Sequence, residues 1–265
     1  MANQKILLQP AYVLHQRAYR DTSVLLELFS PEYGRVGVIA RGVKSAKSRW
    51  RGVLQPFQPL LVSWNQRGEL GTLTGAESQG PALAIAPDLI ASGFYLNEIL
   101  LRLLERDDGQ IELFRFYDET LRGLDKIGAE INAGTDSRPV ALEILLRQFE
   151  MRLLTALGYG LILNEEVGTE SPLQAEQEYI YQLEHGPVKA EDRYANVSKA
   201  SNSTEEEYRY GTRISGSTLM ALDVGDFSDE LVRLESKRLL RNVLGNDLGS
   251  KPLQSRDLVQ SITRH

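Results

Sequence analysis

The part of this 265-residue chain best suited to binding a ligand is a run of basic residues without acidic neighbours. No Asp or Glu lies between Glu32 and Glu69, although the whole chain carries a net charge of −6. The basic residues in this acid-free window are Arg35, Arg41, Lys44, Lys47, Arg49, Arg51 and Arg67. Lys and Arg side chains neutralise phosphates and release their counterions, so the window predicts phosphate binding that weakens as salt rises.

Charge runs are often only a solvated surface, and the neighbouring residues favour phosphate binding here. Ser45 and Ser48 carry hydroxyls that can contact phosphates. Trp50 lies between two arginines and is the one aromatic residue that we consider for stacking on a base, with packing in a core as the alternative. We expect Trp64 and Tyr12 in the core. Nothing in the window resembles a pattern that reads base edges, so we expect little sequence preference.

Strand patterns in the first 80 residues must position this window. Apolar residues form two runs within residues 11–30 and recur in three further segments, at residues 35–40, 57–65 and 70–76. Most of the basic residues fall in the connection at residues 42–56, and Arg67 falls in a turn at residues 66–68. Five short strands with one longer connection after the third are typical of an OB-fold barrel, which binds oligonucleotides. A small SH3-like barrel is the alternative.

Helical periodicity replaces the strand pattern after residue 81. Apolar residues recur at helical spacing in segments 88–105, 110–127, 140–157, 217–222 and 228–244, and a further helix is expected near the C-terminus. We therefore predict an α+β protein in which an OB-fold domain, residues 1–80, precedes a mostly helical domain, residues 81–265. Ten basic and five acidic residues give the first domain a charge of +5, and twenty against thirty-one give the second −11.

An acidic segment at residues 164–213 interrupts the helical domain. It is rich in Ser, Asn and Glu and contains only two short strand-like pieces, at residues 179–184 and 207–210. We expect these pieces to form a small hairpin, with a mobile or disordered connection over residues 186–206.

The composition argues against several classes of site. With no cysteine and only His15, His185 and His265, the chain has no thiolate, no thiol nucleophile and no paired metal-ligand spacing. The sequence also lacks a phosphate-cradling Gly-Lys-Ser/Thr loop and a GxSxG motif, so we predict neither an enzyme nor a bound cofactor. No apolar run reaches the roughly 20 residues of a membrane span. We expect a cytoplasmic protein without a secretory signal.

Five segments in this order resemble signature segments of RecO, a family of bacterial recombination mediators. They read VLHQRAYRDTSVLLELFSPEYGRVGVIARGVKS, GVLQPFQPLLVSW, SGFYLNEILLRLLE, LLRQFEMRLLTALGYG and LGSKPLQSRDL. The resemblance covers nearly the whole chain except the acidic segment. It implies an N-terminal OB-fold, a helical C-terminal domain, and binding and annealing of single- and double-stranded DNA. It also implies RecR, RecF and the single-stranded DNA-binding protein SSB as partners, and association with the nucleoid.

The resemblance also implies that the C-terminal tail of SSB binds around the helix at residues 140–157. An acidic tail that ends in apolar residues needs an apolar groove and a guanidinium group. The residues that we name for this role are Arg102, Leu142, Leu146 and Arg147. The alternative for Arg147 is a side chain that reaches out from an apolar helix face.

The C-terminal segment adds two cations. Lys251 and Arg256 bracket Pro252 and Leu253, and they either extend the DNA-contacting surface or cap a helix end. Some members of the RecO family carry a four-cysteine zinc module after the third helix. Without cysteine this chain cannot build that module, and we expect the acidic segment to take its place without metal.

These observations favour a recombination mediator that, with RecR, helps to load a recombinase on SSB-coated DNA. Two alternatives remain open at this point. One is an adaptor whose barrel binds acidic protein segments, and the other is a barrel protein that binds RNA.

Overall fold

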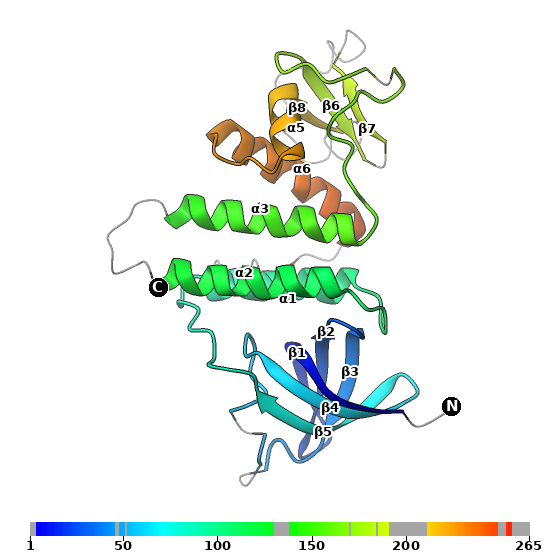
Figure 1. The fold of residues 1–265 in the computed structure, drawn as a ribbon, viewed down its shortest axis with the longest axis vertical. Coiled ribbons are helices and arrows are strands. Elements are labelled where there is room, and N and C mark those ends of the chain that lie inside the picture. The colour runs from blue at the N-terminus through cyan, green and yellow to red at the C-terminus, as the bar shows by residue number, and fades with distance from the viewer. Residues whose placement is uncertain are drawn as a thin grey trace. The chain divides into compact units, whose positions relative to one another are not determined.

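The structure is a computed structural model that describes residues 4–45, 48–50, 52–129, 138–169, 171–183, 185–190, 211–248 and 253–255. The chain forms two compact units (Figure 1). Unit 1 comprises Met1–Arg138 with Lys251–His265, and unit 2 comprises Pro139–Ser250. Among the residues that the structure describes, no helix is long and apolar enough to cross a membrane.

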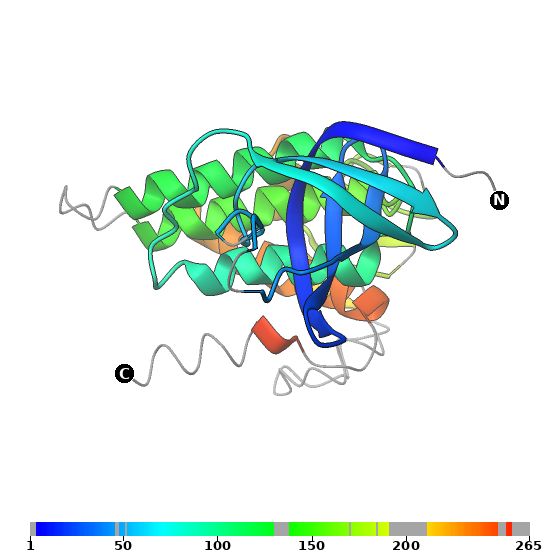
Figure 2. The same ribbon diagram turned by 90° about the horizontal axis from the view of Figure 1, so that it is seen from below.

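The first five strands form the predicted OB-fold barrel. They are β1 (Gln4–Tyr19), β2 (Ser23–Ser30), β3 (Gly34–Ala40), β4 (Leu60–Arg67) and β5 (Leu70–Ser78). The barrel closes in the order β1-β2-β3-β5-β4, and only the β3–β5 pair is parallel. Figure 2 looks onto this barrel, around which the long strand β1 wraps. The order confirms the OB-fold that the strand spacing predicted.

Alternation along the strands decides which side chains fill the barrel. On β2, Val24, Leu26 and Leu28 point into the barrel core, where Trp64 of β4 is 1% exposed. Phe29, on the opposite face of β2, packs instead against helix α2, with its ring 5.4 Å from that of Phe114. Because successive residues of a strand face opposite sides, β2 contributes both to the barrel core and to a helix interface.

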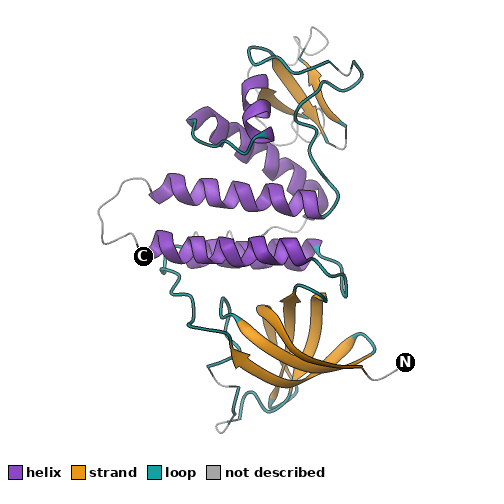
Figure 3. Ribbon diagram, in the orientation of Figure 1, coloured by secondary structure: helices purple, strands orange, loops and turns teal. Residues whose placement is uncertain are grey.

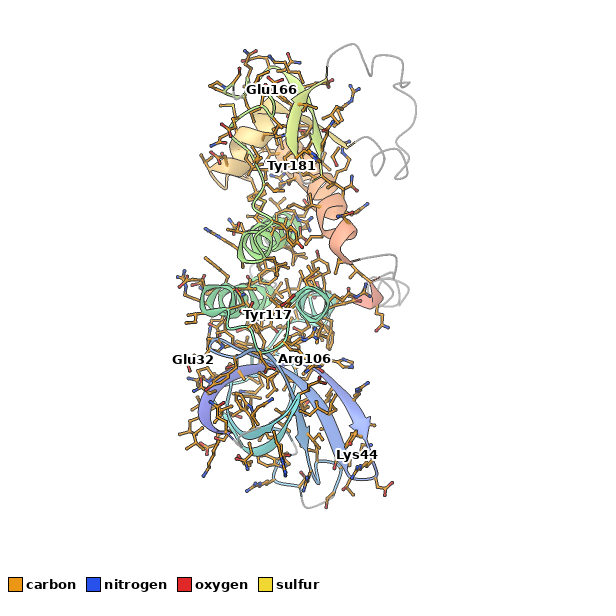
Figure 4. All side chains as sticks on the ribbon, turned by 90° about the vertical axis from the view of Figure 1, so that its right-hand side faces the viewer. Glu32, Lys44, Arg106, Tyr117, Glu166 and Tyr181 are labelled. Atoms are coloured by element: carbon orange, nitrogen blue, oxygen red, sulfur yellow. The ribbon has the colours of Figure 1, made fainter. Side chains whose placement is uncertain are left out.

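Helices α1 (Ile90–Leu103) and α2 (Ile111–Ala129) belong to the same unit as the barrel. Their predicted helical spans are confirmed. The buried Asn97 side chain donates to the Leu14 carbonyl at 3.0 Å and accepts from the Tyr117 hydroxyl at 2.6 Å. Tyr117, labelled in Figure 4, lies where α2 meets the barrel. Buried polar groups that are hydrogen-bonded in this way favour one arrangement of helices on strands.

A second polar contact at this interface makes stability depend on pH. The Tyr12 hydroxyl donates to Asp118 at 2.5 Å, and Arg122 donates to the same carboxylate at 2.8 Å. Burial opposes ionisation of Asp118, but these two hydrogen bonds outweigh it and hold its pKa below the ordinary value. A carboxylate with a depressed pKa stabilises the fold above its unfolded pKa, and this stabilisation is lost as pH falls through the folded pKa.

We therefore expect Asp118→Asn to lower the free energy of unfolding most at neutral pH. The deficit relative to the original protein should shrink between about pH 5 and about pH 2, where the carboxylate becomes protonated. Urea denaturation at several pH values measures this difference. A deficit that stays constant from neutral to acid pH would contradict the role of the charge.

Unit 2 holds the remaining helices and a small sheet, coloured by element type in Figure 3. Its elements are α3 (Arg138–Ala156), β6 (Glu178–Gln182), β7 (Gly186–Lys189), β8 (Thr212–Ser215), α5 (Gly216–Asp223) and α6 (Glu230–Leu248). On α3, Phe149 and Leu153 are buried, whereas Leu142 and Leu146 are only half-buried. Of the predicted C-terminal helix, the structure describes only residues 253–255.

The hairpin prediction was partly wrong. β6 pairs with both β7 and β8, so the sheet has three strands in the order β7-β6-β8. β7 lies in the segment that was expected to be a connection, and residues 207–210 lie outside the described residues. The short sequence of β7, GPVK, is too brief to show strand alternation, which explains the error.

Polar contacts hold this sheet to its surroundings. The Tyr181 hydroxyl accepts the N–H of Ile162 at 3.1 Å, and the carboxylate of Glu166 lies 3.3 Å from the Lys189 amine. Figure 4 labels Glu166 and Tyr181 in this unit. In the described part of the chain, no group of three or more His, Asp or Glu side chains could hold a metal ion.

Candidate nucleic-acid interface

The basic connection between β3 and β4 is anchored in the barrel core. Trp50 and Leu54 are only 7% and 2% exposed and belong to the core cluster. The N–H groups of Val53 and Leu54 both bond to the Trp50 carbonyl, at 3.1 and 3.4 Å, which tightens the chain into a turn. At the other end, the Lys44 N–H donates to the Thr22 carbonyl at 3.0 Å. The connection is therefore held to the barrel at both ends.

This anchoring leaves three predicted cations on the surface. Arg41, Lys44 and Arg49 are exposed, and we call these three residues the basic end of the barrel. Figure 4 shows Lys44 on the barrel, away from Tyr117 and Arg106 at the helix-covered side. Lys47 and Arg51 lie outside the described residues. Exposed cations on a fixed backbone can contact phosphates with little further ordering of the chain.

Arg49 is oriented by two contacts. Its guanidinium lies 4.2 Å from the centroid of the Trp50 ring and donates to the Thr74 carbonyl on β5 at 3.1 Å. The Trp50 ring thus lies in the core beneath Arg49, and this burial argues against the stacking role considered for it. Its function in the structure is to anchor the connection. The cation–π contact keeps the guanidinium above the core.

A substitution separates the two roles of Trp50. We expect Trp50→Leu to lower the free energy of unfolding by roughly 1–3 kcal/mol, because a smaller side chain underfills the core. Any loss of affinity should be equal for single-stranded and duplex DNA, because the variant loses the anchor of the connection and the cation–π contact to Arg49 and no stacking contact. Thermal unfolding and a fluorescence-anisotropy titration measure the two quantities. A stable variant whose binding to single-stranded DNA weakens much more than its binding to duplex would restore the stacking hypothesis.

Arg35 does not belong to the basic end of the barrel. Its side chain is 19% exposed, lies 3.7 Å from the Glu27 carboxylate and donates to the Leu101 carbonyl. Arg106 pairs with the same carboxylate. Burial lowers the pKa of Arg35, against the opposite influence of Glu27. The prediction that Arg35 binds phosphate is therefore unsupported, because its guanidinium is engaged in an internal ion cluster that joins β2 and β3 to the helices.

Arg67 lies elsewhere on the barrel. It is exposed at the end of β4, and the next strand begins at Leu70, which pairs with Gly37 of β3. The structure thus places Arg67 at the turn between β4 and β5, as the sequence predicted. Its contribution to DNA binding stays a prediction.

The outer face of β2 and β3 is covered by the unit's own helices. Phe29 packs against Phe114 and Tyr117 of α2, at ring distances of 5.4 and 5.8 Å. On β3, a side chain at Gly37 would collide with the Arg106 guanidinium. OB-folds often bind oligonucleotides on this face. Here the side chains of α2 and of the α1–α2 connection occupy it, whereas the basic end of the barrel stays exposed.

The residues predicted to bind the SSB tail fall in different units. Arg102 of α1 is in unit 1 and donates to Glu98 at 2.6 Å. Arg147 of α3 is in unit 2, is 11% exposed and lies 2.7 Å from the Glu150 carboxylate. Both guanidinium groups therefore already have carboxylate partners. Lys251 and Arg256 lie outside the described residues.

Two exposed cations in and beside the β1–β2 turn were not predicted from the sequence. Arg17 and Arg20 are exposed, and the hydrogen bond from Lys44 to Thr22 links this turn to the basic connection. These two arginines could have been predicted, because the β1–β2 loop is one of the two loops with which OB-folds contact oligonucleotides.

Family models match both parts of the chain. The model described as "Recombination protein O N terminal" matches residues 3–81, and "Recombination protein O C terminal" matches residues 86–257. DNA repair protein RecO of Nitrosococcus oceani is 46% identical over 260 residues, which cover 98% of this chain and 95% of that protein. The RecO proteins of Alkalilimnicola ehrlichii and Methylococcus capsulatus are 43% and 40% identical, over 100% and 97% of this chain and 95% and 94% of their own lengths. With two family models covering most of its length and relatives this similar, the chain belongs to the RecO family.

Proposed function

We propose that this chain is a DNA repair and recombination mediator that binds single- and double-stranded DNA through its phosphates. Membership of the RecO family supports the repair role, since the relatives are named DNA repair proteins. The observation that carries the DNA-binding proposal is the anchored connection. Trp50 and Leu54 hold it in the core, while the three residues of the basic end stay exposed.

Phosphate contact accounts for binding without sequence preference. The basic end offers guanidinium and ammonium groups, which neutralise phosphates of any sequence. The same groups can hold two strands at once, and neutralising both lowers their mutual repulsion. Annealing of complementary strands therefore needs no bond chemistry, and we propose that the protein acts without catalysing a reaction.

The partner assignments extend this proposal. Docking on the SSB tail would bring the protein to SSB-coated strands, and RecR, with RecF as a further partner, would act with it in loading a recombinase. We further propose two functional domains, residues 1–80 and 81–265, and a cytoplasmic, nucleoid-associated protein. The support for these assignments is membership of the family.

A titration of the full chain tests the proposal. Fluorescence anisotropy should detect binding to single- and double-stranded DNA of mixed sequence, and the affinity for both should fall steeply between about 50 and 200 mM salt. An acidic peptide and an RNA of equal length serve as competitors. Stronger binding of the acidic peptide than of DNA would favour the adaptor function, and a strong preference for RNA would favour an RNA-binding protein.

A further inference from the structure

The turn between β1 and β2 lies beside the basic connection. The Lys44 N–H donates to the Thr22 carbonyl at 3.0 Å. The register of β2 with β3 pairs Val24 with Ala40, so Arg41 follows the strand pair at the same end as Ser23. The β1–β2 turn and the basic end of the barrel therefore share one region of the surface.

This turn is itself cationic. Arg17 and Arg20 are exposed, and neither makes an ion pair with any of the residues that the structure describes. Asp21 is the acid within the turn. With Arg41 and Lys44 nearby, positive side chains outnumber negative ones in this region, which favours a polyanion.

Tyr19 differs from the other aromatic residues of the barrel. Tyr12, Phe29 and Trp64 are at most 1% exposed, and Tyr33 packs edge-on against Trp64 at 5.2 Å. Tyr19 is half-exposed, and among the residues that the structure describes its ring contacts the Arg20 guanidinium, 5.3 Å from the centroid. A partly exposed ring beside cations is the combination with which proteins bind single strands, because bases stack on the ring while cations hold the phosphates.

The backbone conformation of the turn places Arg20 beside Tyr19. Arg20 has a φ of +52°, a left-handed conformation that is uncommon for residues other than glycine. Arg20 lies in the tight turn that joins the paired residues Tyr19 and Ser23, and a positive φ is typical of such hairpin turns. The hairpin turn thus holds the exposed Arg20 side chain directly beside Tyr19.

We propose that Tyr19 is a stacking platform for a base of single-stranded DNA, with Arg17 and Arg20 holding the flanking phosphates. The inference rests on the proposed function and deepens it, because it names the part of the site that distinguishes single strands from duplex. The bases of a duplex are paired and stacked inside, so their faces are not available to Tyr19. The basic end contacts phosphates of either form, whereas Tyr19 adds affinity only for a single strand.

Two substitutions at one position test the proposal. Tyr19→Ala should weaken binding of single-stranded DNA at least about fivefold, with duplex affinity changed by less than about twofold. Tyr19→Phe keeps the ring and should bind both forms like the original protein. Tyr159→Ala removes a tyrosine that is 50% exposed in unit 2, and it should change neither affinity. Thermal unfolding of each variant checks that the fold is intact.

Photo-cross-linking provides an independent readout. A single strand that carries 5-iodouracil should form an adduct on the peptide that contains Tyr19, as located by mass spectrometry. Equal losses on single strands and duplex in Tyr19→Ala, or no loss on single strands, would overturn the assignment to Tyr19 while leaving the proposed function intact. An original protein that binds neither form of DNA would instead overturn the proposed function and this inference together.

Discussion

Replacing Arg41, Lys44 and Arg49 together by Ala is expected to weaken binding of DNA about 100-fold at roughly 50 mM salt. These residues are exposed on a connection that Trp50 and Leu54 anchor in the core, so the three substitutions remove charge without emptying the core. Each lost phosphate contact also removes the counterion release that drives binding at low salt. Anisotropy titrations with one labelled oligonucleotide, as a single strand and as a duplex, measure the loss.

A matched variant controls for net charge. Arg115, Lys126 and Arg241 are also exposed, and their joint replacement by Ala changes the charge of the protein by the same amount. We expect this variant to bind DNA within about threefold of the original protein, because binding depends on the local field more than on the total charge. If both triple variants lost affinity equally, the basic end of the barrel would have no special role.

Gly34→Ala is expected to lower the free energy of unfolding by about 3 kcal/mol or more. Gly34 has a φ of +58°, and a Cβ there would overlap the carbonyl oxygen of Asp108 in the α1–α2 connection. This connection runs along the start of β3, where the Asp107 N–H donates to the Arg35 carbonyl at 3.2 Å. The left-handed conformation costs about 1–2 kcal/mol for an alanine, and overpacking adds roughly 1–3 kcal/mol.

Gly68→Ala separates these two contributions. Gly68, which follows β4, also has a positive φ, +70°, but a Cβ there would meet no atom within 4 Å. The variant should therefore lose only the conformational part, about 1–2 kcal/mol. Urea denaturation compares the two variants. Equal losses would show that the α1–α2 connection does not press against Gly34 in solution.

The barrel could be predicted from local patterns because its strands are short and its turns carry clear signals. The turn at Gly34 and the turn at Gly68 both require glycine, and the alternation of β2 and β3 marks one face as core. Five such strands with one long connection leave few closed arrangements. The helices could be predicted equally well, since their apolar residues recur at helical spacing.

The local sequence does not show which side chains of the acid-free window become buried when the chain folds. Trp50 and Arg35 lie in the same acid-free window as Lys44, yet Trp50 enters the core and Arg35 joins Glu27 and Arg106. Both outcomes depend on residues that are distant in sequence. Arg106 is supplied by the α1–α2 connection, which covers the β2–β3 face only after folding.

Tyr19 is an aromatic side chain that stays partly exposed in the folded protein. In the sequence Tyr19 lies at the break between the two apolar runs of residues 11–30, and no local pattern shows whether its ring is exposed. The structure separates Tyr19 from Tyr12, because Tyr12 is 1% exposed and bonds to Asp118, whereas Tyr19 lies half-exposed in the cationic turn. The difference arises from strand register and helix packing, which single-sequence patterns do not specify.

The salt dependence of binding tests most directly whether the basic end of the barrel binds phosphates. The dissociation constant for one duplex is measured over a range of salt concentrations, for the original protein and for the Arg41, Lys44 and Arg49 triple variant. On a plot of log affinity against log salt, we expect the variant's slope to be shallower by about 0.9 for each lost contact, or about 2.7 in all. Parallel lines for the two proteins would contradict phosphate binding at this end of the barrel.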